Sequence, residues 1–580
     1  MLRTVRTAIT FPGLRGHSAE RHNRINTSPP LNLPLGSVTP NVPTTEPLVV
    51  RLTTGRTSAA LTCAGWALFA LLALVGIGQL FIGVDPQDEG QLLTYPWLIA
   101  HGIMPYQHIW MSYPPGTYLV LAALLKLGLP GLVAERGLSV VVRLLYVLLI
   151  NRALTGSWRR FSWLGTSVSF SLLFLSSGAR AYPWVVGMPL LLLGLLASRD
   201  RPRTAAALFF AAGMFRFEFA LAGCVVLLSL SALDRIDRAW ARRRLAAGLA
   251  LVAATGIFHL ALSAVTGGQA LRDIFLDPIF VVDPAHRLPL FPPYFGPAGV
   301  PLEFLVVGGP PLLIVLGLLH KRPYLVATNL GVLTLLSQFF QRADWQHLFA
   351  AGAVSVPWML FGFGELLYRE NRFHRAVAPV LDGDAGDGEV RTASRLITGT
   401  LAAVGLVVGA CYSIVVLSYG VYLSPLSPVT SESVYRSWSQ HVVHAGSSTI
   451  VASSRGEARD DTQLVAYFHR YARSSQQLFI APITLRYDIY NQTALYYVLG
   501  LHPASKYLEM LPGLEKRATV QKEIIADLRS CKWIVLWKGG FSREPNSSVV
   551  PGSALLEHFV RAHYHVVLQN PTYEVLRRDS

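Results

Sequence analysis

Residues 60–90 read ALTCAGWALFALLALVGIGQLFIGVDPQDEG, so a long apolar run ends in the acidic turn Val84–Gly90. A run of this length can cross a bilayer, which takes about 20 apolar residues in a helix. The adjacent carboxylates Asp88 and Glu89 therefore lie where a membrane helix ends. Ionisable groups at this depth indicate a functional site, although an ordinary solvated helix end has the same pattern, and both interpretations stay open here.

The composition of the whole chain indicates a polytopic α-helical membrane protein. Of the 580 residues, 52% are hydrophobic and only 14% are charged, whereas soluble domains average about 25% charged residues. The net charge of +16 comes mainly from arginine and is typical of cytoplasmic loops, so no nucleic-acid partner is predicted. The four cysteines show no metal-ligand spacing, which argues against a disulfide framework or a structural zinc site.

Loop charges set the predicted topology. Residues 1–58 are basic and lack an apolar run, so we expect a disordered cytoplasmic N-terminus. The run Thr117–Leu129 is short for a membrane span. We interpret this run as a surface-lying or re-entrant helix, because only then does every later basic cluster fall on the cytoplasmic side. About eleven spans follow from this arrangement: residues 60–83, 136–154, 161–178, 182–198, 204–216, 217–233, 245–265, 301–319, 323–340, 347–366 and 395–418.

The fifth and sixth of these spans are too short to cross a bilayer alone. Phe215–Phe219 lies between them and contains Arg216 and Glu218. We interpret the two segments as a broken pair of helices that dips into the bilayer, which requires a protein or water-filled environment for the irregular backbone. Arg216 and Glu218 are then either site residues or a structural ion pair that closes the break.

Three regions follow from this pattern. They are the N-terminal segment 1–58, a membrane domain 59–420 with outer loops 84–135 and 266–300, and a soluble extracytoplasmic α/β domain 421–580. In the last region we expect strands at 449–452, 533–537, 565–568 and 573–576, with helices at 520–528 and 554–563. Asn491 and Asn546 begin N-glycosylation sequons, a pattern short enough to arise by chance.

The outward-facing segments collect the ionisable side chains of an otherwise apolar chain. The segment Arg342–His347 places an arginine, an acid and a histidine within helical contact distance, although a helix cap at the membrane interface would have a similar sequence. Arginine suits phosphate because its planar fork donates two hydrogen bonds at once. A carboxylate within hydrogen-bond reach suits deprotonation of a hydroxyl group, and acids beside a histidine can hold a divalent cation.

Several of these segments resemble a known class of enzymes. They are Asp88–Glu89, Gly102 with Pro105–Tyr106, Tyr113–Gly116 and Arg143–Leu145. Together they resemble the polyprenyl-phosphate-sugar-dependent glycosyltransferases of the GT-C class, in particular the bacterial relatives of protein O-mannosyltransferases and of lipid A aminoarabinose transferases. The resemblance covers roughly residues 60 to 350. Where many members have an acid after the Pro-Tyr pair, this chain has Gln107–His108.

The resemblance implies an inverting hexosyl or pentosyl transfer from a lipid-phosphate sugar to a hydroxyl of an envelope glycan, lipid or protein, at the outer face of a bacterial plasma membrane. It implies that Asp88 or Glu89 is the general base or positions the acceptor. Members differ in their use of metal, so the resemblance does not establish a cofactor. A divalent cation, held by Glu89 and His347, stays open. The candidate donor-phosphate ligands are Arg180, Arg216 and Arg342, and the other pocket candidates are Tyr113, Glu218, Asp283, His286, Arg287, Asp344 and His347.

Two other functions remain compatible with the sequence. A transporter or flippase of a lipid-linked or anionic substrate would also have broken helices and buried charges, but its charges would lie near the membrane midplane. A non-catalytic envelope scaffold would tolerate the loss of Asp88 and Glu89. The aromatic residues Trp110, Tyr113 and Trp345 either face sugar rings or mark the membrane interface.

Overall fold

The computed structural model describes most of the chain. All described residues belong to one compact unit, Glu46–Ser580. The N-terminal segment up to residue 55, the predicted span 395–418 and most of the predicted span 161–178 lie outside the described residues. The described ranges are 56–78, 84–156, 180–233, 237–288, 300–342, 345–377, 441–446, 448–452, 454–487, 491–511, 513–539 and 550–579, with the single positions 161, 169 and 173.

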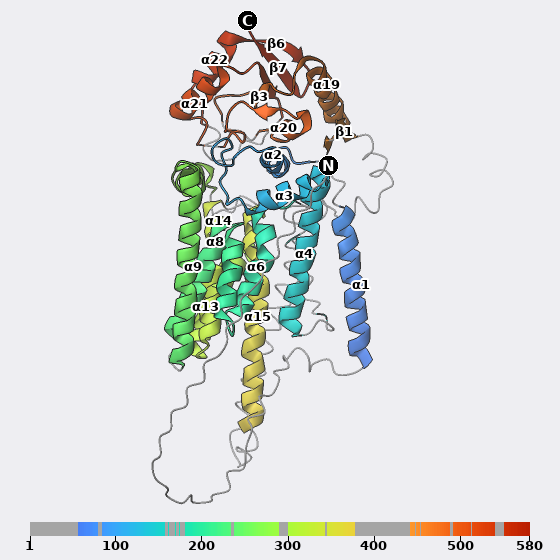
Figure 1. The fold of residues 1–580 in the computed structure, drawn as a ribbon. Coiled ribbons are helices and arrows are strands. Elements are labelled where there is room, and N and C mark those ends of the chain that lie inside the picture. The colour runs from blue at the N-terminus through green and yellow to red at the C-terminus, as the bar shows by residue number, and fades with distance from the viewer. Residues whose placement is uncertain are drawn as a thin grey trace, which may run out of the picture. The chain divides into compact units, whose positions relative to one another are not determined.

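Apolar helices pack side by side around the largest hydrophobic core (Figure 1). They occupy the predicted spans closely, and the first of them begins within the segment predicted to be disordered. The helices with their bounds are α1 (Arg56–Gly78), α4 (Gly131–Thr155), α6 (Pro183–Ala197), α7 (Pro202–Gly213), α8 (Phe217–Leu233), α9 (Arg238–Val265), α12 (Val300–Leu319), α13 (Pro323–Leu335), α14 (Ser337–Gln341) and α15 (Trp345–Val377).

The outer faces of these helices are apolar as well as the inner ones. On α9 the side chains of Leu249, Ile257 and Leu260 are 56%, 67% and 66% exposed. So large an outward apolar face is unfavourable in water and is what a lipid-facing helix requires. Within the described residues, Arg238–Val265 and His347–Leu366 are long and apolar enough to cross a membrane. The number of spans stays a prediction.

Two parts of the predicted topology differ in detail. The predicted span 323–340 is divided at Leu336 into α13 and α14, where the hydroxyls of Thr334 and Ser337 bond to carbonyls of the preceding turn; such bonds compete with the helix's own ladder. The predicted loop 266–300 is helical from Gln269 to His286, as α10 (Gln269–Leu271), the π-helical segments Arg272–Leu276 and Pro278–Val282, and α11 (Asp283–His286).

Two short helices, α2 (Asp88–Ala100) and α3 (Gly116–Lys126), lie in the first outer loop. The 11 residues of α3 extend about 16 Å, which is too short to cross a bilayer. Gly116 donates its amide to the carbonyl of Met214, in the turn between α7 and α8, at 2.9 Å. A Cβ at this position would lie 2.5 Å from that oxygen, so the close contact requires glycine.

The C-terminal segment forms an α/β layer around a mixed five-stranded sheet with the strand order β4-β3-β5-β7-β6. Strand β3 is parallel to β4 and β5, whereas β7 is antiparallel to β5 and β6. The elements are the hairpin β1 (Val442–Ala445) and β2 (Ser448–Val451), α19 (Arg455–Tyr471), β3 (Gln477–Pro482), α20 (Ala494–Leu499), β4 (His502–Pro503), α21 (Ala518–Leu528), β5 (Trp533–Trp537), α22 (Leu555–His563), β6 (Tyr564–Gln569) and β7 (Tyr573–Arg578). The predicted strands and helices are present, but β1, α19, β3, α20 and β4 were not predicted.

The C-terminal layer and the first outer loop share one hydrophobic core. Tyr95, Leu98 and Tyr118 from the loop belong to the same cluster as Leu478 and Trp533 from the sheet. Figure 1 shows α2 and α3 between the long helices and the strands. The C-terminal segment therefore packs against α2, the helix that begins with the acidic residues Asp88 and Glu89.

Burial argues against glycosylation at one of the two sequons. Asn491 has no exposed surface, and its side-chain amide donates to the carbonyls of Ile480 at 2.7 Å and Leu508 at 2.8 Å. Its nitrogen is therefore inaccessible to glycosylation in the folded chain. Asn546 lies outside the described residues.

Candidate active site

The acidic turn is organised by Asp85. Its Oδ1 accepts hydrogen bonds from the backbone amides of Gln87 at 3.1 Å and Asp88 at 2.8 Å, and its own amide donates to Oε2 of Glu89 at 3.1 Å. These bonds satisfy amides that would otherwise lack partners before the first turn of α2. Helix α2 consequently begins at Asp88, where the helix dipole favours a negative charge.

Glu89 forms a buried ion pair with Arg136 of α4. The guanidinium contacts both carboxylate oxygens, with Nη2 2.9 Å from Oε2, and the two side chains are only 1% and 3% exposed. Burial alone would raise the pKa of Glu89, but the charge and hydrogen bonds of Arg136 outweigh burial and hold this pKa below its ordinary value. A fully paired, inaccessible carboxylate cannot receive a substrate proton, so this geometry does not support the predicted catalytic role of Glu89.

Asp88 points away from this pair and accepts a hydrogen bond from the hydroxyl of Tyr182 at 2.6 Å. Nη1 of Arg180 lies 3.8 Å from its Oδ2, and Nη2 of the same arginine lies 3.2 Å from Oδ2 of Asp85. Burial and the neighbouring charge of Asp85 raise the pKa of Asp88, while Arg180 and the Tyr182 hydrogen bond oppose the rise. Since about a third of the Asp88 side chain stays exposed (32%), it can still meet a ligand.

Asp88, the first residue of α2, lines a cavity of about 130 Å³. Apolar side chains of α6, α8, α13 and α15 form much of its wall. The polar side chains that line it are Asp88, Tyr113, Tyr182, Arg216, Glu218 and His347. Charged groups in such a partly apolar, enclosed space interact more strongly than they would in water.

Arg216 lines the same cavity as Asp88. It pairs with Glu218 at 3.0 Å, and its guanidinium lies 4.6 Å from the ring centre of Tyr113, at cation–π distance. The alternative of a structural ion pair at the α7–α8 break is thus present in the structure. The same arginine also lines the cavity, so the two roles are compatible.

Two further predicted residues act on the cavity through their charge. Arg342 is close enough to lower the pKa of Asp88. Burial and the charge of Glu218 raise the pKa of Asp283 to about 6, against the opposing charges of Arg216, His347 and Arg287. Segments that are far apart in the sequence, from Asp88 to His347, therefore converge on one site.

Two other predicted residues, Arg287 and Trp110, do not line this cavity. Arg287 is exposed, and Trp110 is buried in the C-terminal core, where its indole donates to Asp277 at 3.3 Å. Asp344 and the side chains of His286 and Trp345 lie outside the described residues. In the part of the chain that the structure describes, no three His, Cys, Asp or Glu side chains group as metal ligands; Glu89 does not line the cavity that His347 lines.

Sequence reasoning missed three residues that support the site. Two of them, Arg136 and Tyr182, are the first residues of the predicted spans 136–154 and 182–198. The third, Glu509, comes from the C-terminal segment and accepts a hydrogen bond from Tyr95 of α2. Burial raises the pKa of Glu509 to about 8, and no local sequence signal links it to the acidic turn.

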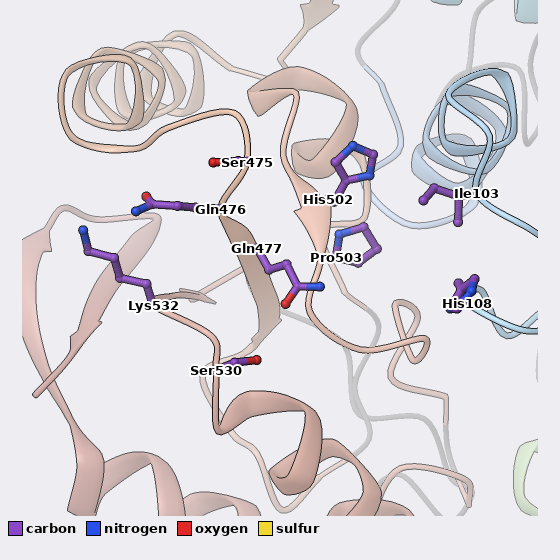
Figure 2. Close-up of a pocket in the computed structure, with 9 residues that line it drawn as sticks. All are labelled: Ile103, His108, Ser475, Gln476, Gln477, His502, Pro503, Ser530 and Lys532. Carbon is purple, nitrogen blue, oxygen red and sulfur yellow. The ribbon is translucent and has the colours of Figure 1, made fainter. Parts of the chain in front are cut away.

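A second hollow lies between the end of α2 and the edge of the C-terminal sheet. Its volume is about 630 Å³, larger than that of the Asp88 cavity. Figure 2 shows Ile103 and His108 on one side and Gln477, Ser530 and Lys532 on the other. None of the residues that line it is a predicted site residue or a carboxylate.

Comparison with known proteins gives matches among solved structures. No protein-family model matches the chain, and no curated protein matches it. The chain is similar to ArnT from Cupriavidus metallidurans in the apo state, with 15% identity, a TM-score of 0.44 and coverage of 89% of this chain and 98% of that one. It is also similar to the same protein bound to undecaprenyl phosphate, with 14% identity, a TM-score of 0.43 and coverage of 88% and 98%.

A third similar solved structure is that of another protein. It is the archaeal oligosaccharyltransferase AglB from Archaeoglobus fulgidus, in complex with an inhibitory peptide and a dolichol-phosphate. The identity is 11% and the TM-score 0.36, with 82% of this chain and 69% of that chain covered.

Proposed function

We propose that this chain is an integral membrane glycosyltransferase of the GT-C type, which moves a sugar from a polyprenyl-phosphate donor to an acceptor hydroxyl on the extracytoplasmic side of a bacterial plasma membrane. The main support is one relationship: Asp88 and Arg216 line the same small cavity. A base and a phosphate-binding cation are the two groups that such a transfer needs at opposite sides of the reacting carbon.

Asp88 acts as the general base in this proposal. Its carboxylate takes the proton of the acceptor hydroxyl while the acceptor oxygen forms a bond to the anomeric carbon. The bond from that carbon to the phosphate oxygen breaks, and its electron pair leaves with the lipid phosphate. A pKa raised by burial makes the carboxylate a stronger base than a solvated one, which favours this proton transfer.

Arg216 and Arg342 hold the departing phosphate. Arg216 is only 7% exposed, so a charge that develops on the phosphate beside it is little screened by water. Arg180, also predicted to bind phosphate, contacts Asp85 and Asp88 in the structure. In this proposal it orients the two acids in the absence of substrate, and its charge opposes the rise in the pKa of Asp88.

The proposed function also implies which parts of the chain lie on each side of the membrane. Lipid contacts the exposed apolar faces of the helices, and the basic loops lie in the cytoplasm with the N-terminus. The acidic turn and the C-terminal layer then lie outside, where a donor lipid reaches the cavity from the bilayer and the acceptor reaches it from the aqueous side.

The test is the activity of purified Asp88→Asn with a panel of labelled polyprenyl-phosphate hexoses and pentoses. We expect turnover to fall by about 10²- to 10⁴-fold, the usual contribution of a general base, with unchanged thermal stability in detergent. Asp579→Asn, the same chemical change on the exposed C-terminal strand end, is the control and should keep full activity. Full turnover by Asp88→Asn on the donor that the native chain uses would remove the proposed mechanism.

A further inference from the structure

A third hollow lies at the other ends of the helices. Helix α6 begins beside the Asp88 cavity, at Pro183, and ends at Ala197, so its far end is about 22 Å away. Just beyond that end the hollow has a volume of about 350 Å³. Its charged lining residues are Arg199, Asp200, Arg244, Lys321, Arg322 and Glu365.

The charge of this hollow is positive. Four of its side chains are basic and two are acidic, and one acid, Glu365, lies 3.6 Å from Arg199. The basic groups come from three separate places: the α6–α7 turn, α9 and the α12–α13 turn. Cations gathered from different segments around a concave space form a site for an anion, because a merely solvated basic face needs no such convergence.

Specific contacts fix the geometry of the arginine side. The guanidinium of Arg199 lies 5.6 Å from the ring centre of Tyr324, and the Tyr324 hydroxyl donates to the carbonyl of Leu195 at 2.8 Å. Nη2 of Arg244 donates to the carbonyl of Arg199 at 2.8 Å. The wall of the hollow is therefore built on helix ends that are tied to one another.

Lys321 has a backbone conformation that its residue type rarely adopts. Its φ angle is +52°, at the end of α12, where the amide of Arg322 donates to the carbonyl of Gly317 at 2.6 Å. Glycine is preferred at such a helix terminus because a side chain strains the left-handed conformation. A lysine in this strained conformation is expected where the positive charge of its side chain contributes to function.

Apolar surface continues from the charged hollow. Leu325, Phe361 and Leu366 line it, and the neighbouring Leu318 and Leu319 of α12 are 55% and 71% exposed. A ligand that fits both surfaces has an anionic head and a hydrocarbon tail. A free anion would use only the charged part.

We propose that this hollow binds the phosphate headgroup of an anionic membrane lipid, with its acyl chains along α12. The inference does not rest on the proposed transferase activity. A phosphate ester could also be supplied by a water-soluble molecule, so the experiment includes one. The membrane source is favoured because the apolar wall adjoins the charged one.

The experiment is native mass spectrometry of the full-length chain in detergent, titrated with phosphatidylglycerol, phosphatidylcholine or glycerol 3-phosphate. We expect phosphatidylglycerol to bind at least tenfold more tightly than the other two. The double variant Lys321→Gln and Arg322→Gln should weaken that binding at least tenfold. Arg203→Gln, which removes an exposed arginine outside the hollow, should leave it unchanged.

A second variant separates binding from folding. Lys321→Gly removes the charge and also relieves the left-handed strain, so its melting temperature should equal or exceed that of the native chain while its phosphatidylglycerol affinity falls. Native affinity in both Lys321 variants overturns the proposal. So does equal binding of glycerol 3-phosphate or phosphatidylcholine, because either result removes the need for an anionic lipid at this site.

Discussion

The hydroxyl of Thr493 lies 3.0 Å from the backbone carbonyl of Gln87, the residue that precedes Asp88. The same hydroxyl lies 3.1 Å from the carbonyl of Pro86, and the hydroxyl of Thr94 donates to the carbonyl of Thr493 at 2.7 Å. Gly90 faces this residue so closely that a Cβ would lie 2.3 Å from its hydroxyl oxygen. The C-terminal segment thus holds the turn that presents Asp88.

Thr493→Val should consequently reduce turnover without unfolding the chain. The change keeps the shape of the side chain but removes the hydrogen bond to the turn, and a small displacement of a catalytic group lowers kcat strongly. We expect kcat to fall about tenfold or more, with KM for the donor changed by less. Steady-state kinetics on the purified variant measure both.

Thr493→Ser is the matched control because it keeps the hydroxyl and loses a methyl group. It should retain most of the native kcat. If Val and Ser at this position behave alike, the hydroxyl does not position the turn, and the effect of the C-terminal segment would have to arise from packing alone.

Tyr182→Phe should change the pH dependence of the reaction. The Tyr182 hydroxyl stabilises the ionised form of Asp88 and so lowers the pKa of this carboxyl. Without it the pKa rises further, and the base is protonated over a wider acidic range. The acid limb of the kcat/KM profile should therefore move to higher pH, whereas at alkaline pH the loss should stay below about tenfold, the scale of one hydrogen bond.

Tyr113→Phe provides the comparison for that measurement. Tyr113 lines the same cavity, and the phenylalanine ring would still lie beneath Arg216. Its acid limb should coincide with that of the native chain. Coincident limbs for native, Tyr182→Phe and Tyr113→Phe would show that the titrating base is not Asp88.

Local patterns in the sequence were sufficient to predict many of the helices and to single out the acidic turn. Apolar runs located the helices because each must satisfy its own backbone in lipid, and Asp88 stood out because a carboxylate is rare in such surroundings. The convergence of Arg216 and His347 with Asp88 was a hypothesis from topology, since residues at the same membrane face share one end of the helix bundle.

Long-range pairing could not be read from the sequence. Asp88 and Glu89 are neighbours with the same charge, and only the approach of Arg136 on one side and Tyr182 on the other separates a buried ion pair from an accessible base. The contact of Glu509 with Tyr95 also cannot be predicted from the sequence, because it depends on the strand order and on the packing of the C-terminal layer against α2. Adjacent residues acquired different roles from distant partners.

The Glu89–Arg136 pair gives a stability prediction that distinguishes it from Asp88. Arg136→Met removes one partner and leaves a buried carboxylate unpaired, which typically costs about 3–5 kcal/mol. The double variant Arg136→Met with Glu89→Gln removes both charges and should recover much of the lost stability. Thermal unfolding in detergent measures each variant, and a double variant no more stable than Arg136→Met would contradict the pairing.

Glu509 provides a pH test of the contact between the C-terminal segment and α2. Its side chain is 4% exposed, and burial raises its pKa to about 8. The folded state therefore holds a proton that the unfolded state, with an ordinary glutamate pKa near 4.5, releases at lower pH. Stability from this group is fully present below the ordinary value and is lost as the pH rises through about 8.

Glu509→Gln removes this titration while its amide oxygen still accepts the Tyr95 hydrogen bond. Relative to the native chain, the variant should gain melting temperature as the pH is raised from 5.5 to 8.5, because only the native chain then has to ionise a buried carboxyl group. Melting curves at several pH values test this directly. If the melting temperatures of the native chain and the variant change with pH in the same way, water reaches Glu509. The contact between the C-terminal segment and α2 is then more hydrated than its burial indicates.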